Sequence, residues 1–196
     1  LVAGHDADLE KALESRFAAF SPTSKQGDGA SGLPVVIGNK GVLLAVMSGQ
    51  RALLESMLKN GANGNSRFED GWTALMIAAF DGQIQLVEIL IDKGAELEVK
   101  GGNGWTALMV AVFNIHPETV ATLIARGADV NAKDNDGKTV LMWAADKGIA
   151  SVVKTLLDKG ANLHVKNDKD STALFYASRG NHAAVIELLK QAGARE

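Results

Sequence analysis

The residues of this chain that could carry out chemistry are few and widely spaced. Its four histidines are His5, His116, His164 and His182. No two of them have the helical spacing of a metal-binding pair, and the lack of cysteine excludes thiolate nucleophiles, disulfides and cysteine metal sites. A Ser/His/Asp triad stays open from sequence alone, but no segment resembles a nucleophile elbow. We therefore predict no catalytic residues, no metal site, no cofactor and no enzymatic activity.

Two glycine-containing segments resemble ligand-binding motifs but lack the required context. Residues 27–32, GDGASG, match G-x-G-x-x-G, yet a polar loop precedes them and LPVVIG follows. A dinucleotide site needs a strand before this motif and a helix after it. Residues 134–137, DNDG, lack the acidic spacing and the final glutamate of a calcium loop. Neither segment predicts a nucleotide or calcium site.

Composition narrows the class of partner. The net charge is −3, from 20 basic and 23 acidic residues, and no basic stripe is visible, so we expect no nucleic-acid partner. No apolar run approaches the roughly 20 residues that a membrane-spanning helix needs, so we expect no membrane insertion. The chain begins at Leu1 and not at Met, which indicates a removed signal peptide or a trimmed chain. We therefore favour the bacterial periplasm over the cytoplasm as the location of a soluble protein.

The elements that must position any functional side chains follow from an internal repeat. The dipeptide Gly-Ala recurs at a constant step of 33 residues, and series of threonine, leucine and alanine keep the same step. Several series that share one phase do not arise from composition alone. The Gly-Ala dipeptides begin at Gly61, Gly94, Gly127, Gly160 and Gly193.

One unit of the repeat, residues 71–95, predicts a pair of short helices. Thr73 can cap the first helix through its hydroxyl, and Gly82 permits the left-handed conformation that ends it. The second helix carries Leu86 and Leu90 on one face. Neither helix can bury its apolar face alone, so neighbouring units must stack.

These units resemble the ankyrin-repeat family over roughly residues 37–196. The family pattern has a turn with Asp and Gly, then Thr-Pro-Leu-His, paired alanines and a closing Gly-Ala-Asp-Val-Asn. The best matches are residues 133–148, KDNDGKTVLMWAADKG, and residues 127–134, GADVNAKD. The resemblance implies an all-α solenoid of stacked helix-turn-helix units, with projecting β-turn fingers beside a concave face. Ankyrin proteins generally bind other proteins through that face.

The chain departs from the family at two kinds of position. Its Thr-Pro becomes Thr-Ala or Thr-Val, and the histidine of Thr-Pro-Leu-His becomes an apolar residue. We interpret the apolar row as packing between neighbouring units and not as a metal or cofactor box. His116 and His182 share another repeat position and are interpreted as structural. The apolar row consists of Leu43, Met76, Met109, Met142 and Phe175.

Both ends of the array differ from the internal units. Residues 6–20 place their Leu and Phe side chains on one helical face and are predicted to cap the first repeat; the alternative is a separate binding arm. At the other end, Asp170 and Lys190 have the polar character of a C-terminal cap, so we expect a natural C-terminus. The predicted organisation is an N-terminal helix and flexible loop in 1–36, and five repeats in 37–196, namely 37–66, 67–99, 100–132, 133–165 and 166–196.

The resemblance also implies which side chains face the concave groove. In the family, two positions vary freely there: the residue after the turn glycine, and the residue after the paired small residues. We expect the aromatic members to form an exposed strip, although for any single ring packing on its neighbours is the alternative. Trp143 and Tyr176 are expected nearby, on the semi-buried side of the first helix. The candidate partner-binding residues are Met47, Trp72, Phe80, Trp105, Phe113, Lys138, Trp143, Asp146 and Tyr176, with Ser171 and Arg179 at the same two positions of the last unit.

An exposed cluster of Trp and Phe is typical of a binding hot spot. We therefore predict a protein–protein interaction module, monomeric when free, that binds another protein through this groove. The alternative is an inhibitor or immunity protein that covers the active site of an enzyme, for example a periplasmic enzyme that cuts the cell wall. A small-molecule site ranks lower, because a solenoid groove is broad and shallow. The predicted polar rim, which favours a partner with a basic edge, consists of Glu69, Asp70, Asn103 and Asp136.

Overall fold

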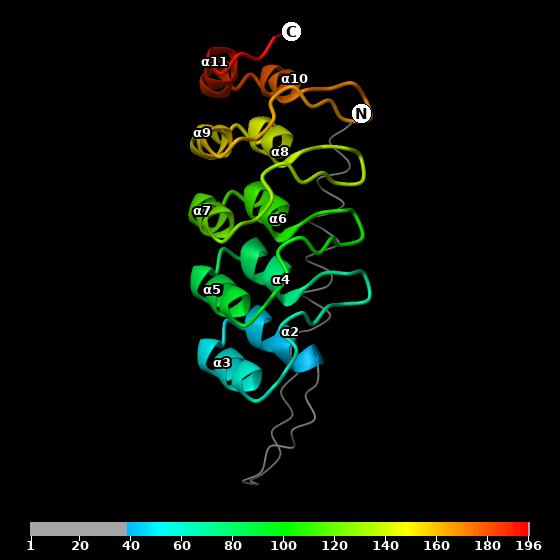
Figure 1. The fold of residues 1–196 in the computed structure, drawn as a ribbon, viewed down its shortest axis with the longest axis vertical. Helices are drawn as coiled ribbons and strands as arrows, with labels where there is room; N and C mark the ends of the chain where they lie inside the picture. Colours follow the sequence, from blue (N-terminus) through cyan, green and yellow to red (C-terminus); the bar gives the residue numbers. More distant parts are fainter. Residues whose placement is uncertain (1–38, 196) are drawn as a thin grey trace. The chain divides into compact units, whose positions relative to one another are not determined.

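The computed structural model describes residues 39–195. They form ten helices, which are stacked as five consecutive pairs (Figure 1). The cap predicted over residues 6–20 lies outside the described residues. Each first helix packs on the first helix of the next pair, and each second helix packs on the next second helix. The pairs are α2 (Asn39–Met47) with α3 (Arg51–Lys59), α4 (Ala74–Phe80) with α5 (Ile84–Asp92), α6 (Ala107–Phe113) with α7 (Pro117–Ala125), α8 (Val140–Asp146) with α9 (Ala150–Asp158), and α10 (Ala173–Arg179) with α11 (Ala183–Gln191).

Local sequence signals set the ends of these helices. The hydroxyl oxygen of Thr73 accepts a hydrogen bond from the backbone N–H of Met76 at 3.2 Å, which confirms the predicted cap of α4. The threonines at the same position cap α6, α8 and α10 in the same way. Gly82 follows α4 with φ 65°, in the left-handed region predicted for it. Pro117 begins α7, where its missing N–H breaks no helical hydrogen bond.

The apolar faces of the pairs are buried by their neighbours. Met76, Met109 and Met142 are each buried almost completely, as the packing interpretation of this row predicts. Alanines next to them, such as Ala78, allow successive first helices to approach closely. Phe175, in the last described pair, is the exception because half of its side chain is exposed.

Two histidines join neighbouring pairs, in agreement with their structural interpretation. The Nε2 atom of His116 donates to the carbonyl oxygen of Phe80 at 2.8 Å, and that of His182 donates to the carbonyl oxygen of Asp146 at 2.9 Å. Each bond caps the end of a first helix in the preceding pair, where carbonyl groups have no partner within the helix. These histidines therefore fix the spacing between pairs.

The loops before the first helices are also joined from pair to pair. We call these the turn loops; in Figure 1 they project from the side of the first helices. Each bond runs from a backbone N–H to a backbone carbonyl oxygen of the preceding turn loop. The pairs are Gly102 to Asp70 at 2.9 Å, Asn135 to Asn103 at 3.2 Å, and Asp168 to Asp136 at 3.1 Å. This ladder of backbone hydrogen bonds holds the loops in register. The turn loops are residues 67–72, 100–105, 133–138 and 166–171.

The structure predicts different losses of stability on substitution of two glycines that share a left-handed backbone, Gly94 after α5 and Gly104 in a turn loop. Gly94 has φ 85° and open space where a Cβ would lie, whereas a Cβ on Gly104, with φ 80°, would lie 2.6 Å from the backbone nitrogen of Asn135. We expect Gly94→Ala to lower the free energy of unfolding by about 1 kcal/mol through backbone strain alone. Gly104→Ala should lower it by about 3 kcal/mol or more, because the next turn loop must also move. Urea unfolding measures both, and equal losses would show that the loops are not tightly packed.

Candidate protein-binding surface

The residue that ends each first helix occupies one continuous row, which we call the end row. Its members are the second of the two predicted groove positions and are supplied by all five described pairs. Met47 and Phe80 are half-buried, and Arg179 is exposed. The row changes from apolar to charged along the array. In order, the end row is Met47, Phe80, Phe113, Asp146 and Arg179.

The aromatic strip is not exposed as the sequence predicted. Trp72, Trp105 and Phe113 retain only 6%, 5% and 4% of their accessible surface. The cause is ring packing within and between pairs. The Trp105 ring lies 4.8 Å from Phe113 of its own pair and 4.8 Å from Trp143 of the next pair, measured between ring centroids. The alternative considered for single rings, packing on their neighbours, therefore holds for most of the strip.

These rings form a fixed cluster with polar contacts at its edge. Phe113 and Trp143 meet edge to face at 5.6 Å, and the ammonium of Lys147 lies 3.7 Å from the centre of the Phe113 ring. The indole N–H of Trp143 donates to the Oδ2 atom of Asp134 at 3.0 Å. Trp143 is buried, so this bond satisfies a donor that could not reach water.

The next pair replaces the ring contact with an ion pair. Lys138 and Asp146 stand at the positions of Trp105 and Phe113 one repeat earlier, and their Nζ and Oδ2 atoms are 2.8 Å apart. Lys138, which was expected to face the groove, is buried, because its ammonium lies 3.4 Å from the centre of the Trp143 ring. Arg179 reaches the other oxygen of Asp146 at 2.7 Å. One carboxylate therefore binds cations from two pairs.

Tyr176 is the remaining predicted ring, and it is buried beside this ion pair. The ammonium of Lys138 lies 4.2 Å from its ring centre, and the side-chain amide of Asn167 donates to its hydroxyl at 2.9 Å. Asn167 and Asp134 were not predicted as contributors. They stand one repeat apart, each nine residues before an aromatic residue with a polar atom, and this shared spacing is the signal that could have identified them.

The predicted rim divides into two kinds of residue. Glu69 and Asp136 are exposed at the tips of the turn loops. Asp70 and Asn103 are half-buried, and their side chains accept hydrogen bonds from the backbone N–H groups of Trp72 and Trp105 at 3.1 and 3.2 Å. These two therefore shape the turns beneath the groove residues, while the exposed acids supply negative charge.

Comparison with known families agrees with this architecture. The model of the family described as ankyrin repeats (3 copies) matches residues 42–134 and 130–195. The chain belongs to the ankyrin-repeat family. Ankyrin repeats are generally protein–protein interaction modules and are typically not enzymes. A search of curated proteins finds no match to this chain.

Two other kinds of feature are absent from the part of the ankyrin array that the structure describes. Within residues 39–195, no three His, Cys, Asp or Glu side chains are grouped so that they could hold a metal ion. None of the helices described there has the length and apolar character of a membrane span.

The shared carboxylate of Asp146 predicts unequal losses from two substitutions. Asp146→Asn weakens both ion pairs of a side chain that is 13% exposed, so it should lower the free energy of unfolding by about 3 kcal/mol. Lys138→Met keeps an apolar stem against the rings and leaves Asp146 paired with Arg179, so the loss should be about 1 kcal/mol. Urea unfolding tests the order, and a larger loss for Lys138→Met would contradict it.

Tyr176 provides a direct test of the buried polar cluster. Burial raises the pKa of its phenol above 10.0, and the nearby Asp146 carboxylate raises it further. A raised pKa of an acid means that the folded state favours the neutral form. This contribution to stability is therefore present below about pH 10 and is lost as the pH rises through the folded pKa.

The chain contains a single tyrosine, so the ultraviolet absorbance of tyrosinate reports Tyr176 alone. We expect a titration midpoint above 10.0 in the folded protein and of about 10 in concentrated urea. Asp146→Asn should lower the folded midpoint, because it removes the negative charge. A folded midpoint equal to that in urea would show that the phenol is not shielded from water.

Proposed function

We propose that this chain is a protein-binding module whose partner lies along the end row and contacts several of its units at once. The observation that carries the proposal is the continuity of that row. It passes from half-buried Met47 and Phe80 to the ion pair of Asp146 and Arg179 without changing its position on the helices. A partner that follows the row would meet an apolar surface first and a charged surface afterwards.

The packed rings support this proposal in a different way from the one expected. Phe80 is held edge to face against Trp72, with ring centroids 6.2 Å apart, and is still half-buried. A side chain that is already ordered loses little conformational entropy when a partner covers it. The buried rings thus act as the support beneath the contact surface, whereas Met47, Phe80 and Arg179 supply contacts.

The charges near the row indicate the chemistry of the partner. Glu69 and Asp136 are exposed at the tips of the turn loops, and Asp146 is already paired with Arg179. Basic side chains at the edge of a partner would complement the two exposed acids. We therefore propose a protein partner with an apolar centre and a basic edge. A scaffold and an inhibitor would both use such a surface.

The first test is affinity capture from extracts of the source cells with three baits. The wild type is compared with Met47→Lys/Phe80→Ser, which alters the apolar part of the row, and with Glu88→Lys, which changes an exposed charge on the second helix α5. We expect a protein that is retained by the wild type and by the α5 control but lost by the double variant. Mass spectrometry identifies it.

Calorimetry with the identified protein then measures the effect. We expect the double variant to bind at least about tenfold more weakly, which corresponds to about 1.4 kcal/mol. Thermal unfolding checks that the double variant is folded, because Phe80→Ser also removes the ring contact with Trp72. Equal affinities of the double variant and the wild type would place the binding surface elsewhere. If the partner is an enzyme, loss of its activity on mixing distinguishes an inhibitor from a scaffold.

A further inference from the structure

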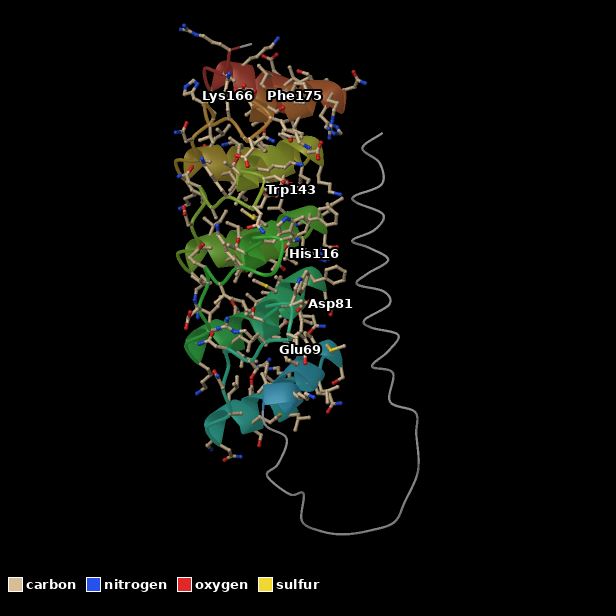
Figure 2. The ribbon with its side chains drawn as sticks, turned by 90° about the vertical axis from the view of Figure 1, so that its right-hand side faces the viewer. Glu69, Asp81, His116, Trp143, Lys166 and Phe175 are labelled. Atoms are coloured by element: carbon tan, nitrogen blue, oxygen red, sulfur yellow. The ribbon has the colours of Figure 1, made fainter. Side chains whose placement is uncertain are left out.

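The last described pair exposes a position that every earlier pair buries. Leu43, Met76, Met109 and Met142 share this repeat position and are buried where the following pair covers them. Phe175 occupies the position in α10 and is 50% exposed. It lies on the outermost pair of the stack, with no described pair beyond it (Figure 2). We call the surface around Phe175 the forward face.

The first described pair exposes the opposite side of the same kind of junction. Leu44 is 39% exposed, whereas Ile77 and Trp143, at its repeat position, are buried. Trp143 shows what covers this position, because its ring contacts Trp105 and Phe113 of the preceding pair. Leu53 of α3 is 40% exposed, and every later member of its position is buried. We call the surface of Leu44 and Leu53 the backward face.

One repeat position carries a polar side chain that hydrogen-bonds to the backbone of the following repeat. Asn131 accepts from the N–H of Asn162 at 2.8 Å and donates to the carbonyl oxygen of Gly160 at 3.4 Å, and both belong to the following segment. Asn65 makes the same two contacts with Glu96 and Gly94. In the last repeat this position is His164, which is exposed and retains a donor and an acceptor in its ring.

The segment after the first described pair carries backbone groups that could form the corresponding hydrogen bonds with His164 of another copy. Gly61 and Asn63 stand one repeat before Gly94 and Glu96, so their carbonyl and N–H correspond to those that Asn65 contacts. The forward face also has a hollow of about 590 Å³, whose lining joins the apolar Leu163, Leu174 and Phe175 to polar residues that include Lys166, Asp170 and Arg195.

We propose that two copies of this chain join head to tail, with the backward face of one copy, which carries Leu44 and Leu53, packed on the forward face of the other, which carries Phe175. The occupant of the forward face is a second copy because the backward face is the matching half of the same junction, which the chain itself forms four times between its described pairs. Such a contact uses two different surfaces and leaves one of each free, so association continues beyond a dimer.

This proposal replaces the free monomer expected from the sequence. The predicted polar C-terminal cap rested on Asp170 and Lys190, and both residues are exposed. The cap is incomplete in physical terms, however, because Phe175 of α10, in the same repeat, leaves apolar surface exposed. Exposed apolar surface of this kind favours association.

The test uses the full chain and two sets of variants, each of which removes one face. Phe175→Glu removes the forward face, and Leu44→Glu/Leu53→Glu removes the backward face. Sedimentation velocity over a range of concentrations measures the mass. We expect the wild type and the α5 control Glu88→Lys to grow beyond the dimer as concentration rises, and each face variant alone to remain monomeric.

Mixing the two face variants distinguishes this junction from any other self-association. Each variant retains the face that the other lacks, so an equimolar mixture should form one junction, double the mass of the monomer and grow no further. Thermal unfolding checks that the variants are folded, which we expect because all three substituted side chains are substantially exposed.

Three results would overturn the proposal. The first is a wild type that stays monomeric at millimolar concentration, including a monomer in which cross-linking joins residues 6–20 to the backward face of the same chain. The second is a mixture of the face variants that stays monomeric. The third is a wild type whose growth stops at the dimer, because a closed dimer requires a different surface.

Discussion

No helix pair in this chain can bury its apolar side alone, and the rest of the structure depends on that constraint. A first helix of seven residues makes too few contacts to be stable in water and is held by the pairs before and after it. The Met76 and Ile77 positions illustrate this, because both side chains are buried inside the array, whereas Phe175 and Leu44, at the same two positions of the end pairs, are exposed. Caps, turns and loop hydrogen bonds then fix how the pairs meet.

The same constraint explains why the groove residues are less accessible than their positions suggested. A large side chain beside a junction gains more by covering its neighbour than by remaining in water. Trp105 does so in both directions, against Phe113 of its own pair and Trp143 of the next. A partner therefore meets the edge of a packed cluster and not a row of free rings. Its contacts are fewer, but the residues that make them are already ordered.

Features that depend on one unit could be predicted from the sequence. The cap at Thr73, the turn at Gly82 and the start of α7 at Pro117 follow from local backbone chemistry, and the structure has all three. The exposure of Trp105 could not be predicted in this way. One of the two rings that cover it, Trp143, lies 38 residues later, and the register of the repeat does not show how far a ring extends into the next unit.

The exchange of a ring pair for an ion pair shows how the array varies its surface while keeping its packing. Trp105 and Phe113 contact each other in one pair, and Lys138 and Asp146 contact each other at the same positions in the next. A buried ion pair adds little net stability over an apolar contact, because both charges lose their water. It fixes the orientation of the Asp146 carboxylate, however, so that the second oxygen can bind the exposed Arg179. The same two repeat positions therefore support the apolar end of the row through a ring contact and its charged end through an ion pair.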